Sequence, residues 1–191
     1  MFSPQWLAFK AAVARHFSWA IPTARSMELI ATFTDRVVEI GAGSGYWAWM
    51  MSQAGISVRA FDACPPEALW HPVRVGDERS IEKHRSRTLF LCWPPSGMPM
   101  ASNALDLYRG RHLIFVGEWG HGCADSKYFA AVRRDFDLVG GDSIPQWFMR
   151  DDRLMVFERK RRLSAGAIPP SPRSLPAAPS RTKRALRFED A

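Results

Sequence analysis

The chain has 191 residues, of which 47% are hydrophobic and 12% aromatic, and this is enough for one globular domain with an ordinary core. It has no run of about 18 apolar residues, so we expect a soluble protein that does not cross a membrane. Cys64, Cys92 and Cys123 lack the spacing of a disulfide framework or a zinc site, which favours a cytoplasmic protein without a structural metal.

The net charge of +7 comes entirely from the C-terminal part of the chain. Residues 1–158 contain 17 basic and 17 acidic residues, whereas residues 159–191 contain 9 basic and 2 acidic ones. The main part of the chain is therefore not expected to form a surface for polyanions. Binding of a nucleic acid or another acidic partner is compatible with the sequence only through the basic tail.

Two helices are expected in residues 1–33, packed on the core. Ser3 and Pro4 suit an N-cap and a first helical turn, and four apolar residues then recur at helical spacing: Trp6, Phe9, Val13 and Phe17. Thr23 caps a second helix to about residue 32, with Met27 and Ile30 facing inward. Because residues 1–27 contain basic but no acidic residues, an organellar presequence is the alternative interpretation.

From residue 34 onward, strands and helices alternate. Strands are predicted at 36–40, 57–61, 72–75, 88–93, 112–116, 136–139 and 154–158, and helices at 46–53, 98–108 and 126–134. This order predicts a doubly wound α/β domain over 34–162, with a mostly parallel seven-stranded sheet, helices on both faces and an antiparallel edge hairpin closed by loop 140–152. Residues 163–191, rich in proline, serine and arginine, are predicted to be a flexible tail.

The first predicted strand runs into a glycine-rich turn, Glu39-Ile40-Gly41-Ala42-Gly43-Ser44-Gly45. Glycines in such a turn let the bare backbone approach a ligand. A dinucleotide-binding G-x-G-x-x-G motif needs its third glycine where this chain has Tyr46. The sequence instead resembles motif I of class I S-adenosylmethionine (SAM)-dependent methyltransferases.

The resemblance implies SAM as the cofactor and a role for three acids that end predicted strands. Glu39 would hold the methionine end of SAM, Asp62 the ribose hydroxyls and Asp77 the adenine amino group. The other cofactor residues that it implies are Gly41, Ala42, Gly43, Gly45, Tyr46, Cys92 and Trp93. Taken alone, Asp62 and Asp77 could also be turn or helix caps.

Cys92-Trp93-Pro94-Pro95-Ser96 stands where methyltransferases of amino groups carry Asn/Asp-Pro-Pro-Tyr/Phe. Trp93 replaces the side chain that accepts the amine in those enzymes, so methylation of nucleobase amines is not expected. Trp93 and Pro94 would belong to the catalytic loop, while a core tryptophan is the alternative interpretation of Trp93.

Glu118 and His121 lie in a glycine-rich loop after the fifth predicted strand, where ligands bind in doubly wound folds. They are the candidate general bases, with a solvated acid as the alternative for Glu118. Three tryptophans are expected to form an aromatic acceptor pocket: Trp93, Trp119 and Trp147. The hypothesis is a methyltransferase of a small molecule; the alternatives are a nucleic-acid or protein methyltransferase recruited by the tail and a non-catalytic binding module.

Overall fold

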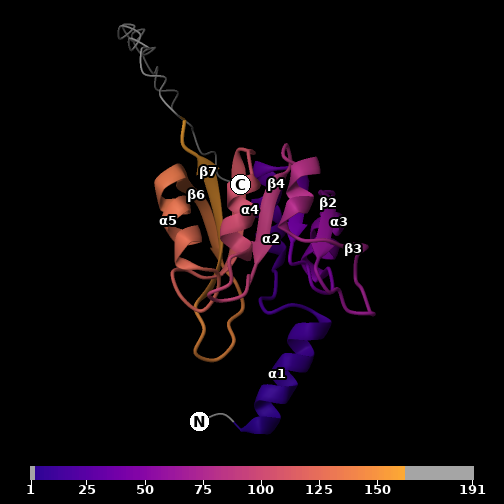
Figure 1. Cartoon of the computed structure of the whole chain (residues 1–191). Coiled ribbons are helices and arrows are strands. Elements are labelled where there is room, and N and C mark those ends of the chain that lie inside the picture. The colour runs from indigo at the N-terminus through magenta and orange to yellow at the C-terminus, as the bar shows by residue number, and fades with distance from the viewer. Residues whose placement is uncertain (1–2, 162–191) are drawn as a thin grey trace, which may run out of the picture. The chain divides into compact units, whose positions relative to one another are not determined.

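The computed structural model describes residues 3–161 of the chain, and the predicted tail at 163–191 lies outside the described residues. Figure 1 shows its elements in chain order: α1 (Pro4–His16), α2 (Ala24–Phe33), β1 (Arg36–Ile40), α3 (Tyr46–Gln53), β2 (Ser57–Asp62), β3 (Val73–Val75), the 3-10 helix η1 (Glu78–Lys83), β4 (Thr88–Cys92), α4 (Met100–Leu107), β5 (His112–Glu118), α5 (Ser126–Asp135), β6 (Phe136–Ser143) and β7 (Asp152–Arg159). Within this part of the chain, no helix has the length and apolarity that a bilayer crossing requires.

The strands form one sheet in the order β3-β2-β1-β4-β5-β7-β6. Strands β1 to β5 are parallel to one another, and β7 is antiparallel to both β5 and β6. The prediction of a doubly wound, seven-stranded sheet with an antiparallel edge hairpin is therefore confirmed. The chain order reverses between β1 and β4, and the connections that follow these two strands lead to helices on opposite faces, α3 and α4, an arrangement that leaves a crevice for a ligand in doubly wound folds.

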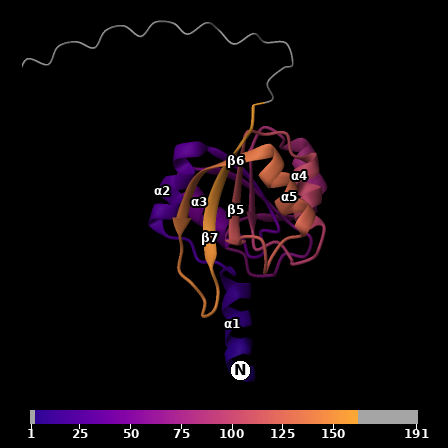
Figure 2. The same ribbon diagram turned by 90° about the vertical axis from the view of Figure 1, so that its left-hand side faces the viewer.

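The sheet is buried on both faces because its central strands are apolar at successive positions. In β4, Leu89 and Leu91 pack in the core beneath α4 and α5, whereas Phe90 packs in the core beneath α2 and α3. Figure 2 shows these two helix layers on opposite sides of the sheet. Alternation along each strand thus decides which side of the molecule a side chain faces.

The edge hairpin is longer than predicted, and this changes what lies near its loop. β6 continues to Ser143 and β7 begins at Asp152, with Ser143 paired to Arg153. A register shift between Leu138 and Gly140 lets the ladder continue through the glycines that suggested a loop. The connecting loop therefore spans 144–151, and Asp152 belongs to a strand.

The exposed side of α1 also differs from the expectation. Ser3 caps the helix as predicted, accepting a hydrogen bond from the Trp6 amide. Phe9 does not face inward, because its side chain is 62% exposed, and the buried residues of α1 are Lys10 and Ala14. Helix α2 is more conventional, with Met27 and Ile30 in the core.

Candidate active site

The glycine turn after β1 presents bare backbone to an open space. Gly43 has a left-handed backbone, and a Cβ placed there would meet no described atom within 4 Å. Gly45 is needed for packing, since its Cβ would lie 3.1 Å from the carbonyl oxygen of His71. The turn is anchored to β2 by two hydrogen bonds, which the amides of Gly41 and Ala42 donate to the Phe61 carbonyl at 2.9 and 3.0 Å.

A cavity of about 450 Å³ lies in front of this turn, at the carboxyl ends of β1, β2 and β4. This volume is typical of a small-molecule site. Six of the predicted cofactor residues line it: Glu39, Gly41, Ala42, Gly43, Asp62 and Cys92. Four others do not line it in the described part of the chain: Gly45, Tyr46, Asp77 and Trp93.

Glu39 places a buried carboxyl group in the wall of the cavity. Its side chain is 1% exposed, and Oε2 has no hydrogen-bond partner among the described residues. Burial, followed by the charge of Asp62, raises the pKa of Glu39 to about 8. Because a buried acceptor without a donor is costly, a ligand with a cationic N–H group would be well matched to this position.

Asp62 is oriented by the backbone. Its Oδ2 accepts a hydrogen bond from the Gly43 amide and its Oδ1 one from the Cys64 amide, both at 2.8 Å. Each carboxylate oxygen keeps a further lone pair for a ligand hydroxyl. Asp77 is exposed and serves as the N-cap of η1, accepting from the Arg79 amide at 3.0 Å; its contact with adenine stays a prediction.

The segment His16–Ala20, here called the strap, covers the cavity between α1 and α2. Phe17, Ser18 and Trp19 line the cavity wall. Four side chains from distant parts of the chain hold the strap by donating to its carbonyl groups: Ser44 to Phe17 (2.7 Å), Trp47 to Ala20 (2.8 Å), Trp70 to His16 (2.8 Å) and Trp147 to Trp19 (2.9 Å). The eight tryptophans of the sequence were the only signal of this structure, and they do not reveal which carbonyls they bind.

Strand alternation brings the polar residues of four strands to one face of the sheet. Glu39 alternates with core residues of β1, and Cys92, Glu118 and Asp152 follow the same parity in β4, β5 and β7. Glu118 and Asp152 are direct register partners on neighbouring strands. Asp152 was not among the predicted site residues, because the sequence pattern placed it in the hairpin loop.

Trp93 connects the β4 loop to this row of acids. Its indole N–H donates to Asp152 Oδ1 at 2.7 Å, and its ring lies 6.2 Å from that of Trp19. Its backbone is left-handed with φ of 48°, which is strained for a bulky residue by about 1–3 kcal/mol. The Pro94 carbonyl accepts from the Ala124 amide at 2.8 Å, so the loop is tied to the segment after β5.

The two predicted bases occupy different environments. Glu118 is buried, and its Oε2 lies 3.0 Å from the Arg150 guanidinium. The His121 side chain is 72% exposed, with Nδ1 3.9 Å from the same oxygen. Asp152 is fully buried, its Oδ2 has no partner among the described residues, and burial raises its pKa to about 6. The catalytic roles of Glu118 and His121 stay predictions.

The expected pocket of Trp93, Trp119 and Trp147 is not formed. Trp119 stacks on Phe157, with ring centroids 5.1 Å apart, and lines a separate cavity of about 570 Å³ beside α5. The reason is strand parity, since β5 continues through Glu118 and turns the next side chain to the opposite face. Across residues 3–161, no three His, Cys, Asp or Glu side chains are grouped so as to hold a metal.

No protein-family model matches this sequence, and no curated protein is similar to it in sequence. Solved structures do match. One is 1,6-didemethyltoxoflavin-N1-methyltransferase of Burkholderia thailandensis, with bound 1,6-didemethyltoxoflavin and S-adenosylhomocysteine (TM-score 0.55, 12% identity, covering 84% of this chain and 92% of that one).

Two further matches have similar scores. Magnesium protoporphyrin IX methyltransferase of Synechocystis PCC 6803, with bound SAM, has a TM-score of 0.51 and 13% identity, covering 84% of this chain and 86% of that one. The N-methyltransferase NodS of Bradyrhizobium japonicum WM9 has a TM-score of 0.50 and 12% identity, covering 83% and 89%. At these identities the likeness is one of fold.

Proposed function

We propose that this chain, which has the Rossmann-like fold of class I SAM-dependent methyltransferases, is itself such an enzyme and methylates a small molecule. The observation that carries the proposal is the unpartnered Oε2 of Glu39 inside the cavity. The α-ammonium group of SAM is a cation with N–H donors, which is what this buried oxygen requires.

The other cavity residues fit the rest of SAM. Asp62 is held by two amides and keeps free lone pairs for the ribose hydroxyls, and the space in front of Gly43 admits a ligand against the backbone. When bound, SAM supplies a methyl group made electrophilic by its positively charged sulfur. The protein's own contribution is to bind, to orient and, through the strap, to exclude water.

We assign to Asp152 the role of contacting the methyl acceptor. Above pH 6 it is largely ionised, and its free Oδ2 would take a hydrogen bond or a proton from an O–H or N–H group. Trp93 fixes the other carboxylate oxygen. Glu118 stays a candidate for the base, although its ion pair with Arg150 lowers its availability.

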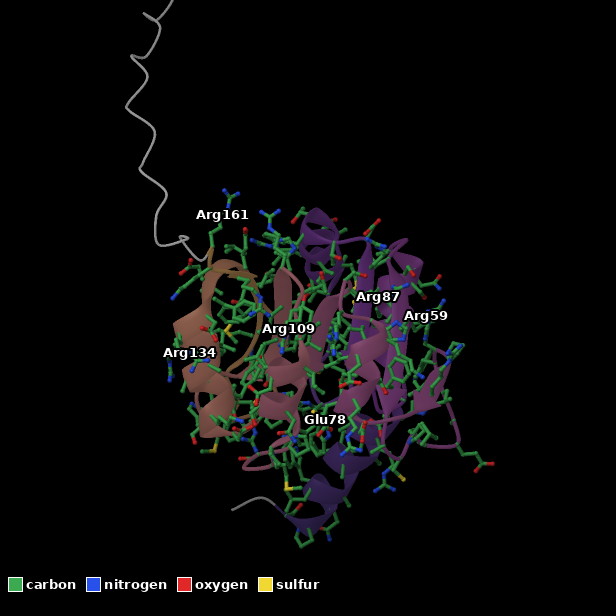
Figure 3. The ribbon with its side chains drawn as sticks, turned by 45° about the horizontal axis from the view of Figure 1, so that its top comes forward. Arg59, Glu78, Arg87, Arg109, Arg134 and Arg161 are labelled. Atoms are coloured by element: carbon green, nitrogen blue, oxygen red, sulfur yellow. The ribbon has the colours of Figure 1, made fainter. Side chains whose placement is uncertain are left out.

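A small acceptor is favoured over a nucleic acid by the charge of the main part of the chain. Residues 1–158 have equal numbers of basic and acidic residues. Figure 3 shows Arg59 beside Arg87, with Arg109 and Arg134 apart from them on other elements. Phosphate backbones bind to an excess of positive charge, and the equal numbers of basic and acidic residues over 1–158 supply no net excess.

Calorimetry with S-adenosylhomocysteine (SAH) tests the cofactor. We expect a dissociation constant in the micromolar range, about −8 kcal/mol. Asp62→Ala should lose about 1–3 kcal/mol by leaving ribose hydroxyls unpaired. Asp106→Ala, at a surface carboxylate that pairs with Lys127, is the matched control and should bind like the wild type. The absence of both heat and a thermal shift with SAH and SAM would refute the cofactor proposal.

Radiolabelled methyl transfer tests the acceptor. Label from SAM should enter a metabolite fraction, and not nucleic acid or protein. Labelled N6-methyladenine or N4-methylcytosine would refute the small-molecule proposal. Such products are not expected, because the indole of Trp93 has no hydrogen-bond acceptor that could orient an exocyclic amine. Bound cofactor with no transfer to any fraction would favour the non-catalytic module.

A further inference from the structure

The ammonium group of Lys10 lies among three tryptophans. Its Nζ is 5.6 Å from the ring centroid of Trp6, 5.9 Å from that of Trp19 and 5.4 Å from that of Trp147. Lys10 is 8% exposed, and no hydrogen bond or ion pair reaches its Nζ from the other described residues. A cation within about 6 Å of one aromatic face is common, but three faces around a single ammonium form a cage. These three residues are called the indole cage below.

Charges of both signs surround the indole cage. Burial, the largest effect, and the charge of Arg150 lower the pKa of Lys10, and the carboxylates of Asp152 and Glu118 oppose this lowering without overcoming it. Arg150 is itself paired with Glu118. The carboxylate of Asp152 therefore has no cationic partner within ion-pair distance among the described residues, and its negative charge acts on whatever occupies the cage.

The indole cage adjoins the cavity assigned to SAM. Trp19 belongs to both, since it lines the cavity and faces Lys10. Trp19 also lies 6.2 Å from Trp93, which binds Asp152. A ligand in the cage would thus be next to the cofactor and to the acid proposed to contact the acceptor.

Lys10 is held in the cage by a helix that buries little else. The buried residues of α1 are Lys10 and Ala14, while Leu7 and Phe9 are 52% and 62% exposed. In Figures 1 and 2, α1 lies beyond the ends of the strands and contributes to neither helix layer of the sheet. Trp6 lies on the same helix, one turn before Lys10, so the cage stays intact when Lys10 leaves by rotation about its own side-chain bonds while α1 stays in place.

We propose that the indole cage is the subsite for an alkylammonium group of the small-molecule acceptor, and that Lys10 occupies this subsite in the ligand-free protein. The identification of this ligand as the methyl acceptor rests on the proposed function, whereas the binding of a cation in the cage does not. Flat aromatic faces backed by a carboxylate select a positively charged group over a neutral group of the same shape, which is how aromatic cages distinguish quaternary ammonium from its carbon analogue.

Binding of choline and of its neutral carbon isostere, 3,3-dimethylbutan-1-ol, to the full-length protein tests this. Lys10→Ala vacates the cage and should bind choline at least tenfold more tightly than the wild type or Lys10→Arg. Removing one cage face in that background, with Trp6→Leu, should weaken choline binding about threefold or more. Lys127→Ala, at a lysine that forms a surface ion pair instead, should behave like the wild type.

A second measurement needs no variant. Saturating choline should displace Lys10 in the wild type and speed its acetylation by an amine-reactive reagent relative to Lys127, read by mass spectrometry. Equal affinity for choline and the neutral alcohol, no gain in Lys10→Ala, or unchanged Lys10 acetylation would each overturn the proposal. SAH calorimetry on the same samples reports the cofactor site separately, so loss of choline binding with intact SAH binding refutes the cage and not the methyltransferase.

Discussion

Glu39 couples the binding of a ligand to the release of a proton. With a pKa of about 8 its carboxyl group is mostly protonated at neutral pH, whereas a carboxylate paired with the SAM ammonium is ionised. At pH 6.5 we expect about one proton to be released per SAH bound, measured from calorimetric heats in buffers of different ionisation enthalpy. Glu39→Gln should abolish this release, and Glu67→Gln, at an exposed acid, should retain it. Binding heats in the wild type that are the same in all buffers would contradict the pairing of Glu39 with the ammonium group of the ligand.

The same carboxyl group affects stability in a defined direction. Its folded pKa lies above the ordinary 4.5, so its stabilising contribution is complete below about pH 4.5 and is lost as the pH rises through about 8. Asp152, with a pKa raised to about 6, acts in the same direction over a narrower range. The unfolding free energy of the ligand-free protein should therefore fall with pH across this window, and less steeply in Glu39→Gln.

Assigning the acceptor contact to Asp152 or to Glu118 leads to different predictions for the turnover of the variants. If Asp152 contacts the acceptor, Asp152→Asn should lower turnover about 100-fold or more without changing SAH affinity, and wild-type turnover should rise with pH through about 6. Glu118→Gln should chiefly lower the melting temperature, because it leaves the Arg150 guanidinium without its buried partner. A large loss of turnover in Glu118→Gln at unchanged stability would return the role of base to Glu118.

At the scale of elements, the strap controls access to the cavity. Trp70→Phe removes the indole donor to the His16 carbonyl but keeps a ring beside Phe17. We expect it to cost about 1 kcal/mol, to speed SAH dissociation about fivefold and to increase hydrogen exchange at residues 17–20. Trp49→Phe is the control, since the N–H of Trp49 has no hydrogen bond within residues 3–161. Equal dissociation rates in both variants would show that the strap does not gate the cavity.

The local sequence was sufficient to predict the central strands of the sheet. Apolar runs bounded by glycine, proline or aspartate predicted β1, β2 and β4 to within a residue, because such runs are stable only when buried on both faces. The glycine turn and Asp62 could be placed at the cavity for the same reason, since the ends of parallel strands meet at one edge.

The acceptor side could not be predicted from local patterns. Strands β6 and β7 extend beyond their apolar cores, so Asp152 was assigned to a loop. Strand β5 continues through Glu118, so Trp119 lies in a separate cavity and not in the predicted acceptor pocket. The cage around Lys10 joins α1, the strap and the loop after β6, and no periodicity in the sequence reports contacts between segments so far apart.

At the scale of the whole molecule, the described part of the chain should be independent of the tail. The last strand ends at Arg159, and residues 1–158 are balanced in charge. Deleting residues 163–191 should leave the melting temperature and the SAH affinity unchanged, while any binding to nucleic acid should weaken with the loss of positive charge. Unfolding of the shortened chain would show that the domain boundary at 162 is wrong.

The tryptophans bound to the strap should make the intrinsic fluorescence of the protein sensitive to movement of this segment. Trp47, Trp70 and Trp147 each donate an indole N–H to this one segment, and a fourth indole, Trp19, lies within it. Movement of the strap transfers several indoles from protein carbonyls to water at once. Indole emission depends on this change of polarity, so the entry and exit of ligands can be followed by intrinsic fluorescence without attaching a label.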